Sequence, residues 1–234
     1  MNTKPNILLV HGAWGDASHW RHVIPSLHAK GYQVSAVQNP LTSLADDINR
    51  TSKLAAMQNG PTILVGHSYG GEVITGAGHT PNVVGLVYIA AFAPDEGESI
   101  NSIFAREDPP PGAANIHPDK DGFLWIDQDK FRESFCQDLD ETESLVMAVT
   151  QKPIAARCFD DKSGPPAWKV KPSWYQISKN DRMIPPETEK FMADRIKPKK
   201  TIAIDASHAS MASHPKEIVV LIEEASRAFM AKAA

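Results

Sequence analysis

Short apolar runs alternate with segments of helical periodicity from the start of the chain to residue 91. Runs that are apolar throughout, rather than at every second position, are typical of strands buried on both faces of a sheet. Four such runs lie in this part of the chain, at 6–10, 34–37, 62–65 and 83–90. Between them, residues 20–27 and 44–57 carry apolar side chains at helical spacing. The alternation predicts an α/β fold with a mainly parallel sheet and helices on both faces.

The pattern changes between about residues 94 and 168, where proline-rich, acidic and mixed stretches replace it. We expect an insertion between two sheet strands, with short helices at 130–135 and 141–150. Its aromatic residues would serve as apolar anchors. An aromatic-rich insertion at this place predicts a lid over a pocket.

The sheet pattern returns after this insertion, with candidate strands at 173–178 and 201–204. One helix is expected to open at Pro185 and Pro186, and a last amphipathic helix begins at Pro215. A chain of 234 residues is long enough for one substantial core. We therefore expect residues 1–234 to form a single domain that carries the insertion.

The charge of the chain narrows the range of partners. A formal net charge of −4 without long runs of one sign does not favour nucleic-acid binding or a polybasic membrane contact. The N-terminal segment lacks the form of a secretory signal, and its apolar run is too short for a transmembrane helix. These features predict a cytoplasmic protein, in which Cys136 and Cys158 are free thiols.

The segment Gly66-His67-Ser68-Tyr69-Gly70 carries the strongest chemical signal. It has the form Gly-x-Ser-x-Gly, it follows a candidate strand directly, and a helical segment comes after it. A sharp strand-to-helix turn of this kind lifts the serine hydroxyl above the sheet edge and presents backbone N–H groups to developing negative charge. Ser68 is therefore the candidate nucleophile; the alternative is a helix cap in a tight connection.

A second loop, which contains His11, Gly12, Ala13 and Trp14, follows the first candidate strand and should meet Ser68 at the same sheet edge. An oxyanion hole needs two preorganised N–H donors. The expected pair is the backbone N–H of Ala13 and that of Tyr69. We expect His11 to brace the loop by hydrogen bonding rather than to act as a base.

The candidate general base is His208, in a loop after the late strand at 201–204. Its rival His214 stands where the final helix begins, a place that favours capping or packing. The acid that orients the histidine is expected to be Asp181, which follows the strand at 173–178. Asp95 follows the neighbouring strand and stays an alternative. The chain order Ser, Asp, His is the one expected for a nucleophile on a strand-to-helix turn.

The chain resembles the α/β-hydrolase superfamily from end to end. The resemblance is carried by four motifs in this order: Val-His-Gly-Ala-Trp, Gly-His-Ser-Tyr-Gly-Gly, Asn-Asp-Arg-Met-Ile-Pro-Pro and Ser-His-Ala-Ser. The opening motif and the compact lid look like small carboxylesterase-type serine hydrolases and, more distantly, the plant methylesterase and hydroxynitrile lyase group. The lyases carry a threonine beside the oxyanion loop and a lysine after the catalytic histidine. Gly12 and Ala209 stand at those positions here, and both departures favour ester hydrolysis. The resemblance implies a catalytic triad and no cofactor.

The expected reaction is cleavage of a small carboxylic ester through an acyl-enzyme. It needs no metal, nucleotide, nucleic acid or membrane, and its partner is a small-molecule ester; a homo-oligomer stays open. Other uses of the same fold, as a lyase, a cofactor-free oxygenase or a small-ligand signalling receptor, are the alternative. Apolar residues near the expected active edge or in the lid are candidates for the substrate pocket: Trp14, Tyr69, Phe92, Trp125, Met183 and Met211.

Overall fold

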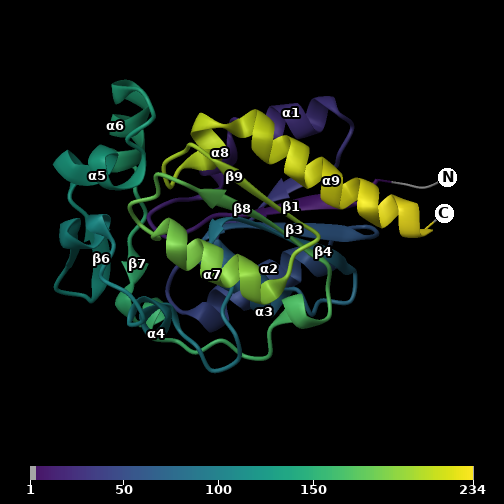
Figure 1. Cartoon of the computed structure of the whole chain (residues 1–234), viewed down its shortest axis with the longest axis horizontal. Helices are drawn as coiled ribbons and strands as arrows, with labels where there is room; N and C mark the ends of the chain where they lie inside the picture. Colours follow the sequence, from purple (N-terminus) through teal and green to yellow (C-terminus); the bar gives the residue numbers. More distant parts are fainter. Residues whose placement is uncertain (1–3, 234) are drawn as a thin grey trace.

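The computed structural model describes residues 4–233 and is built around one parallel sheet (Figure 1). Its six strands lie in the order β2-β1-β3-β4-β8-β9, and every neighbouring pair is parallel. The strands are β1 (Asn6–Val10), β2 (Val34–Ala36), β3 (Thr62–Ser68), β4 (Val83–Ala91), β8 (Ser173–Ser178) and β9 (Lys200–Ile204). The α/β class and the mainly parallel sheet expected from the sequence are thus confirmed.

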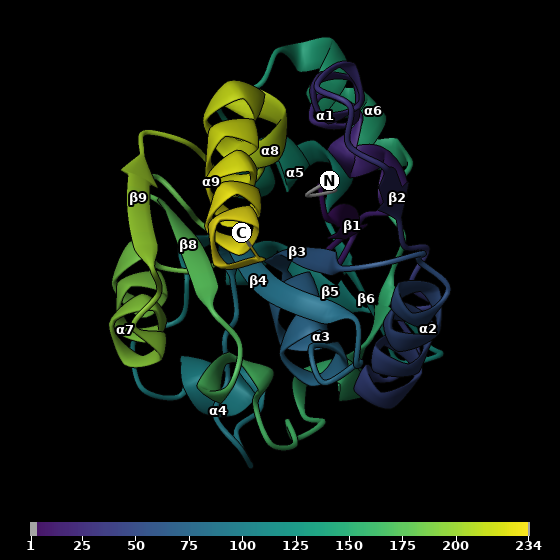
Figure 2. The ribbon, with the colours of Figure 1, turned by 90° about the vertical axis from the view of Figure 1, so that its right-hand side faces the viewer.

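Helices cover both faces of this sheet (Figure 2). One face carries α1 (Ile24–Ala29), α8 (Ser210–Ser213) and α9 (Pro215–Ala233), and the other carries α2 (Leu44–Ala56), α3 (Tyr69–Ala77) and α7 (Pro186–Ile196). Successive side chains of a strand point to opposite faces. Ile7 and Leu9 accordingly pack in the core with α9, whereas Leu8 and Val10 pack in the core with α2 and α3. Burial on both sides explains why the central strands β1, β3 and β4 are mostly apolar.

The segment between β4 and β8 contains the expected helices and a small sheet that the sequence did not predict. Strands β5, β6 and β7 form this second, antiparallel sheet. Residues 94–168, here called the inserted segment, lie beside the carboxyl ends of the main strands (Figure 1). Its elements are α4 (Ile100–Phe104), η2 (Pro111–Asn115), β5 (Ile116–Pro118), β6 (Phe123–Ile126), α5 (Gln128–Phe135), α6 (Glu141–Val149), β7 (Ile154–Ala155), η3 (Ala156–Phe159) and η4 (Ala167–Lys169).

The first expected helix differs from the structure. Residues 20–27 do not form one continuous helix: a 3-10 turn, η1 (Ala17–Trp20), is followed by α1, which begins at Ile24. Pro25 occupies the first turn of α1, where its missing N–H costs no hydrogen bond. Elsewhere the element boundaries lie within a few residues of those expected. None of the helices in residues 4–233 combines the length and the apolar character needed to cross a bilayer.

Candidate active site

Ser68 ends strand β3 and immediately precedes helix α3. Its backbone has φ 54° and ψ −127°, a conformation that is strained for a residue with a side chain. The neighbouring chain is very close, because a Cβ on Gly70 would lie 2.5 Å from the carbonyl oxygen of Val10. Only glycine fits there. The turn therefore holds Ser68 where the first residues of α3 begin, and the N–H of Tyr69 has no acceptor within the helix.

The loop after β1 meets Ser68 directly. A Cβ on Gly12 would lie 2.7 Å from the Cβ of Ser68, so glycine allows this close approach. Ala13 and Tyr69 line the same cavity as Ser68. The indole N–H of Trp14, a residue with φ 56°, donates a hydrogen bond of 2.9 Å to the carbonyl oxygen of Leu124 in β6. The inserted segment is thereby joined to the loop that contains Ala13, one of the two candidate oxyanion donors.

His11 holds this loop in place. Its Nε2 accepts a hydrogen bond of 3.0 Å from the N–H of Asn39, so the other ring nitrogen carries the proton and donates to the Gly12 carbonyl oxygen at 2.8 Å. Burial lowers the pKa of His11 to about 4 and keeps the ring neutral. Both nitrogens are occupied, which is the bracing arrangement expected from the sequence.

His208 and Asp181 form a buried pair. The Nδ1 of His208 lies 2.6 Å from Oδ2 of Asp181, and both side chains are fully buried. The other carboxylate oxygen of Asp181 accepts from the N–H groups of Met183 at 2.7 Å and Ile184 at 2.8 Å. Among residues 4–233, Nε2 of His208 has no hydrogen-bond partner. That nitrogen is therefore free to accept a proton, while the pair fixes the orientation of the ring.

The rival residues have other partners. Asp95 forms an ion pair with Lys169 at the protein surface. The Lys169 side chain, which hydrogen-bonds to it, holds the pKa of Asp95 below its usual value. His214 lies 2.9 Å from the hydroxyl of Ser213 and 4.0 Å from Asp138. The structure thus brings together His208 and Asp181, and it places Asp95 and His214 in local surface contacts.

His67 and Phe135 enclose the histidine. The ring of His67 lies 4.7 Å from that of His208, and its Nε2 donates a hydrogen bond of 2.8 Å to the backbone carbonyl oxygen of His208. Burial holds the pKa of His67 well below its usual value, so this ring is neutral. Phe135 packs edge-on against His208 with ring centroids 4.8 Å apart. Nothing in the sequence motif around Ser68 revealed that His67 bonds to the loop of His208.

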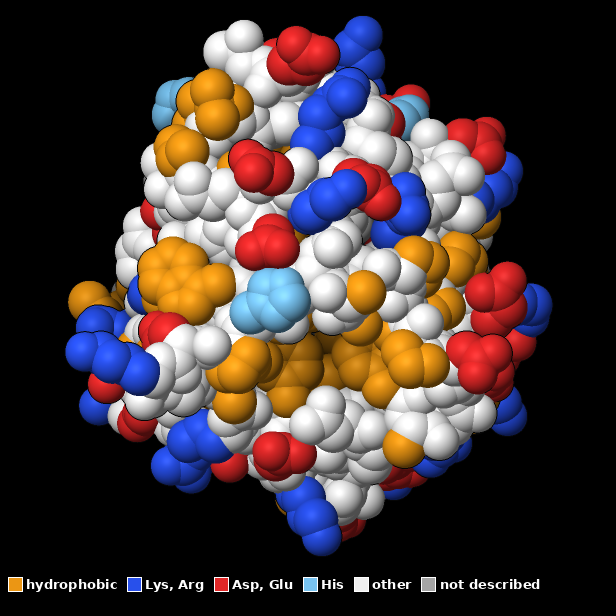
Figure 3. Space-filling model, turned by 90° about the vertical axis from the view of Figure 1, so that its left-hand side faces the viewer, with side chains coloured by type: hydrophobic (Ala, Val, Ile, Leu, Met, Phe, Trp, Pro, Cys, Tyr) orange, Lys and Arg blue, Asp and Glu red, His pale blue; other side chains and the backbone are white. Residues whose placement is uncertain are grey.

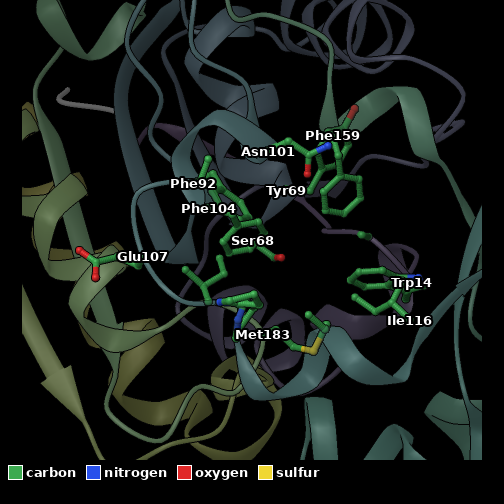
Figure 4. A pocket seen from close by; sticks show the side chains of 16 residues that line it. Trp14, Ser68, Tyr69, Phe92, Asn101, Phe104, Glu107, Ile116, Phe159 and Met183 are labelled. Carbon is green, nitrogen blue, oxygen red and sulfur yellow. The ribbon is translucent and has the colours of Figure 1, made fainter.

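A cavity of about 360 Å³ opens at Ser68. Hydrophobic side chains gather in a hollow on the face that carries the inserted segment (Figure 3), and the side chains of the cavity surround Ser68 (Figure 4). Glu107 is the one charged residue that the structure shows in this lining, and its carboxylate points away from Ser68 (Figure 4). Of the expected pocket residues, the lining contains Trp14, Tyr69, Phe92 and Met183.

Trp125 and Met211 lie elsewhere, contrary to expectation. Trp125 is 37% exposed, and its indole N–H donates to Asp119 at the surface, because successive residues of β6 face opposite sides. Met211 is fully buried in the core beneath α9. In their place, the inserted segment supplies Phe104, Phe159 and other lining residues that sequence reasoning missed. These residues lie in short, aperiodic stretches, so no local pattern distinguished them from core.

Comparison with known proteins defines the class of this protein. Residues 7–221 match the alpha/beta hydrolase family, and the chain belongs to that family. It is 31% identical over 131 residues to the carbendazim hydrolyzing esterase of Nocardioides sp., a match that covers 47% of this chain and only 52% of that one. It is 26% identical to methylesterase 3 of Arabidopsis thaliana over 94% of this chain and 95% of the relative. The distant likeness to plant methylesterases is thereby confirmed.

Among solved structures, a pyrethroid hydrolase from Sphingobium faniae superimposes with a TM-score of 0.83. The alignment has 22% identity and covers 97% of this chain and 98% of the other. At this identity the match shows the fold alone. Within residues 4–233, no group of three or more His, Cys, Asp or Glu side chains is arranged to hold a metal ion.

Proposed function

We propose that the protein is a serine esterase in which Ser68 is the nucleophile, His208 the general base and Asp181 the orienting acid. The observation that carries the proposal is the buried His208–Asp181 pair, whose Nε2 is free, at the same sheet edge as the strained Ser68. Nucleophilic catalysis by a serine needs a base whose ring is fixed by a third group.

In the proposed reaction, Ser68 Oγ attacks the ester carbonyl carbon as His208 Nε2 takes its proton. The backbone N–H groups of Ala13 and Tyr69 stabilise the tetrahedral oxyanion, and each such donor contributes about 3 kcal/mol to lowering the barrier. His208 then protonates the departing alkoxide, which leaves an acyl group on Ser68. A water molecule, activated by the same histidine, releases the acid and restores the serine.

The cavity supports neutral esters with an apolar or aromatic group as the substrate class. Its lining is mostly aliphatic and aromatic, and the structure shows no Lys, Arg or His in it to bind a substrate anion. The names of the relatives, which refer to carbendazim, pyrethroid and methyl ester hydrolysis, support the same class of bond. We further propose that the chain forms one domain into which residues 94–168 are inserted. We also propose that the protein is located in the reducing cytoplasm, which the free buried thiols of Cys136 and Cys158 support.

Hydrolysis of p-nitrophenyl esters of graded acyl length tests this proposal. We expect turnover by the natural chain, its loss in Ser68→Ala, and a fall in kcat of about 10³ to 10⁴ in Asp181→Asn, because the histidine loses its orienting acceptor. Asp95→Asn is the matched control and should retain activity. Absent turnover from the folded natural chain would refute the esterase proposal in favour of a lyase or a receptor. Equal losses in both aspartate variants would refute the assignment of the acid.

A further inference from the structure

The loops that contain His208 and Asp181 share a support outside the main sheet. This support consists of residues 135–138 of the inserted segment, namely the last residue of helix α5 and the turn after it, which we call the α5 turn. Gln137 Nε2 donates a hydrogen bond of 2.6 Å to the carbonyl oxygen of Asn180, the residue before the candidate acid. Gln137 therefore bonds to the loop that contains Asp181.

On the other side, Asp138 Oδ2 accepts a hydrogen bond of 2.9 Å from the N–H of Ser207. The N–H of Ala209 donates to the carbonyl oxygen of Phe135 at 3.2 Å. The residues immediately before and after His208 are thus both bonded to the α5 turn. The Phe135 ring packs against the imidazole itself.

These bonds supplement anchors within the main fold. The N–H of Asn180 donates to Ala206 at 3.1 Å, and His67 donates to the carbonyl oxygen of His208 at 2.8 Å. Loss of the α5 turn contacts would therefore leave the two loops in place but less closely fixed. Small displacements of a catalytic group are sufficient to slow a reaction that depends on near-attack geometry.

We propose that Gln137 and Asp138 are positioning residues that hold the loops of Asp181 and His208 in register, so that the inserted segment sets the geometry of the base as well as covering the pocket. This inference rests on the proposed function for its kinetic readout only. Neither residue lines the cavity, so their loss should change kcat rather than KM.

The test compares the double variant Gln137→Ala/Asp138→Ala with Gln128→Ala/Asp129→Ala, a matched change at exposed positions of α5. With a p-nitrophenyl ester we expect kcat of the first variant to fall about 10-fold to 100-fold while KM stays within about twofold. The control should keep both constants. Asp138→Asn retains an acceptor oxygen for the Ser207 N–H and should restore most of the activity lost in Asp138→Ala.

A second measurement does not depend on turnover. We expect the proton shared by His208 Nδ1 and Asp181 Oδ2 to give a far-downfield ¹H NMR signal, because the two atoms lie 2.6 Å apart. Asp181→Asn should assign this signal by removing it. We expect faster solvent exchange of this proton in the double variant than in the control. If the natural chain has no esterase activity, the proposed function fails and this signal still decides the inference.

Unchanged kcat and unchanged exchange in the double variant would overturn the proposal, and so would an equal loss in the control. If the double variant does not fold, the single variant Asp138→Ala replaces it. Its kcat must then fall at constant KM, by a smaller factor than expected for the double variant. A rise in KM without a fall in kcat would also overturn it, since that would indicate a role in substrate binding.

Discussion

Asp47, on helix α2, offers a sharp test of the electrostatics beneath the active site. Its side chain is fully buried. One carboxylate oxygen accepts a hydrogen bond of 2.6 Å from the hydroxyl of Tyr69, and the other accepts from the N–H of Leu41 at 2.9 Å. Burial raises the pKa of Asp47 from 3.8 to about 6, against the lowering effect of these two hydrogen bonds. Asp47→Asn keeps the shape of the side chain and removes the charge.

The sign of the effect follows from linkage. Because the pKa is higher in the folded state, the favourable contribution of Asp47 is complete below pH 3.8 and is lost as the pH rises through about 6. A difference of about two pKa units corresponds to about 3 kcal/mol of unfolding free energy, and about 2 kcal/mol of it falls between pH 4 and pH 8. The asparagine variant carries no such titration, so its stability relative to the natural chain should rise by that amount over this range.

Urea unfolding at several pH values between 4 and 8, followed by circular dichroism, measures this difference. Titrations of groups that Asp47 does not influence occur in both proteins and cancel. A difference in unfolding free energy that does not change with pH would refute the reasoning, and one that falls with rising pH would mean that the ionised carboxylate is stabilised by its partners.

Three further outcomes are expected. Trp14→Phe keeps the aromatic wall but loses the indole hydrogen bond to β6, so we expect about 1 kcal/mol less stability in urea unfolding and a several-fold lower kcat. In His67→Phe the ring contact survives without the bond to the carbonyl of His208; kcat should fall at constant KM, and a natural kcat would contradict that role. Burial raises the pKa of Cys136 to about 11 and that of Cys158 to about 12, so neither thiol should react with iodoacetamide until the protein is unfolded, as mass spectrometry would show.

The sheet and its catalytic edge were accessible from the sequence because each depends on local patterns. Strands buried on both faces are apolar over most of their length, and β1, β3 and β4 could be located on that basis. Ser68 is marked by the glycines that its turn requires. The partners His208 and Asp181 then followed from one topological fact, namely that the carboxyl ends of parallel strands meet at one edge.

The inserted segment resisted prediction for the opposite reason. Strands β5 and β7 have only three and two residues, and they exist because β6 pairs with both of them. Such short strands carry no periodic signal of their own. The sequence also could not tell which aromatic side chains face the cavity, because the twofold alternation along β6 sends Trp125 outward.

The connections of the inserted segment explain why substrate preference and catalytic rate should not vary independently in this protein. The 3-10 turn η2 lies next to the cavity. The N–H of Gly112 in this turn donates a hydrogen bond of 2.7 Å to the carbonyl oxygen of Arg182, the residue after Asp181. Asn115 in the same turn donates to Ser134 of α5 at 2.8 Å. Helix α5 leads directly into the turn that holds the loop of His208. A substitution that reshapes this wall of the cavity therefore acts on the same short segments that fix the acid and the base. Interactions within one such network are not additive, so we expect substitutions in η2 or α5 to alter kcat together with KM. Phe92 lines the cavity from the end of β4, and substitutions there should alter KM alone.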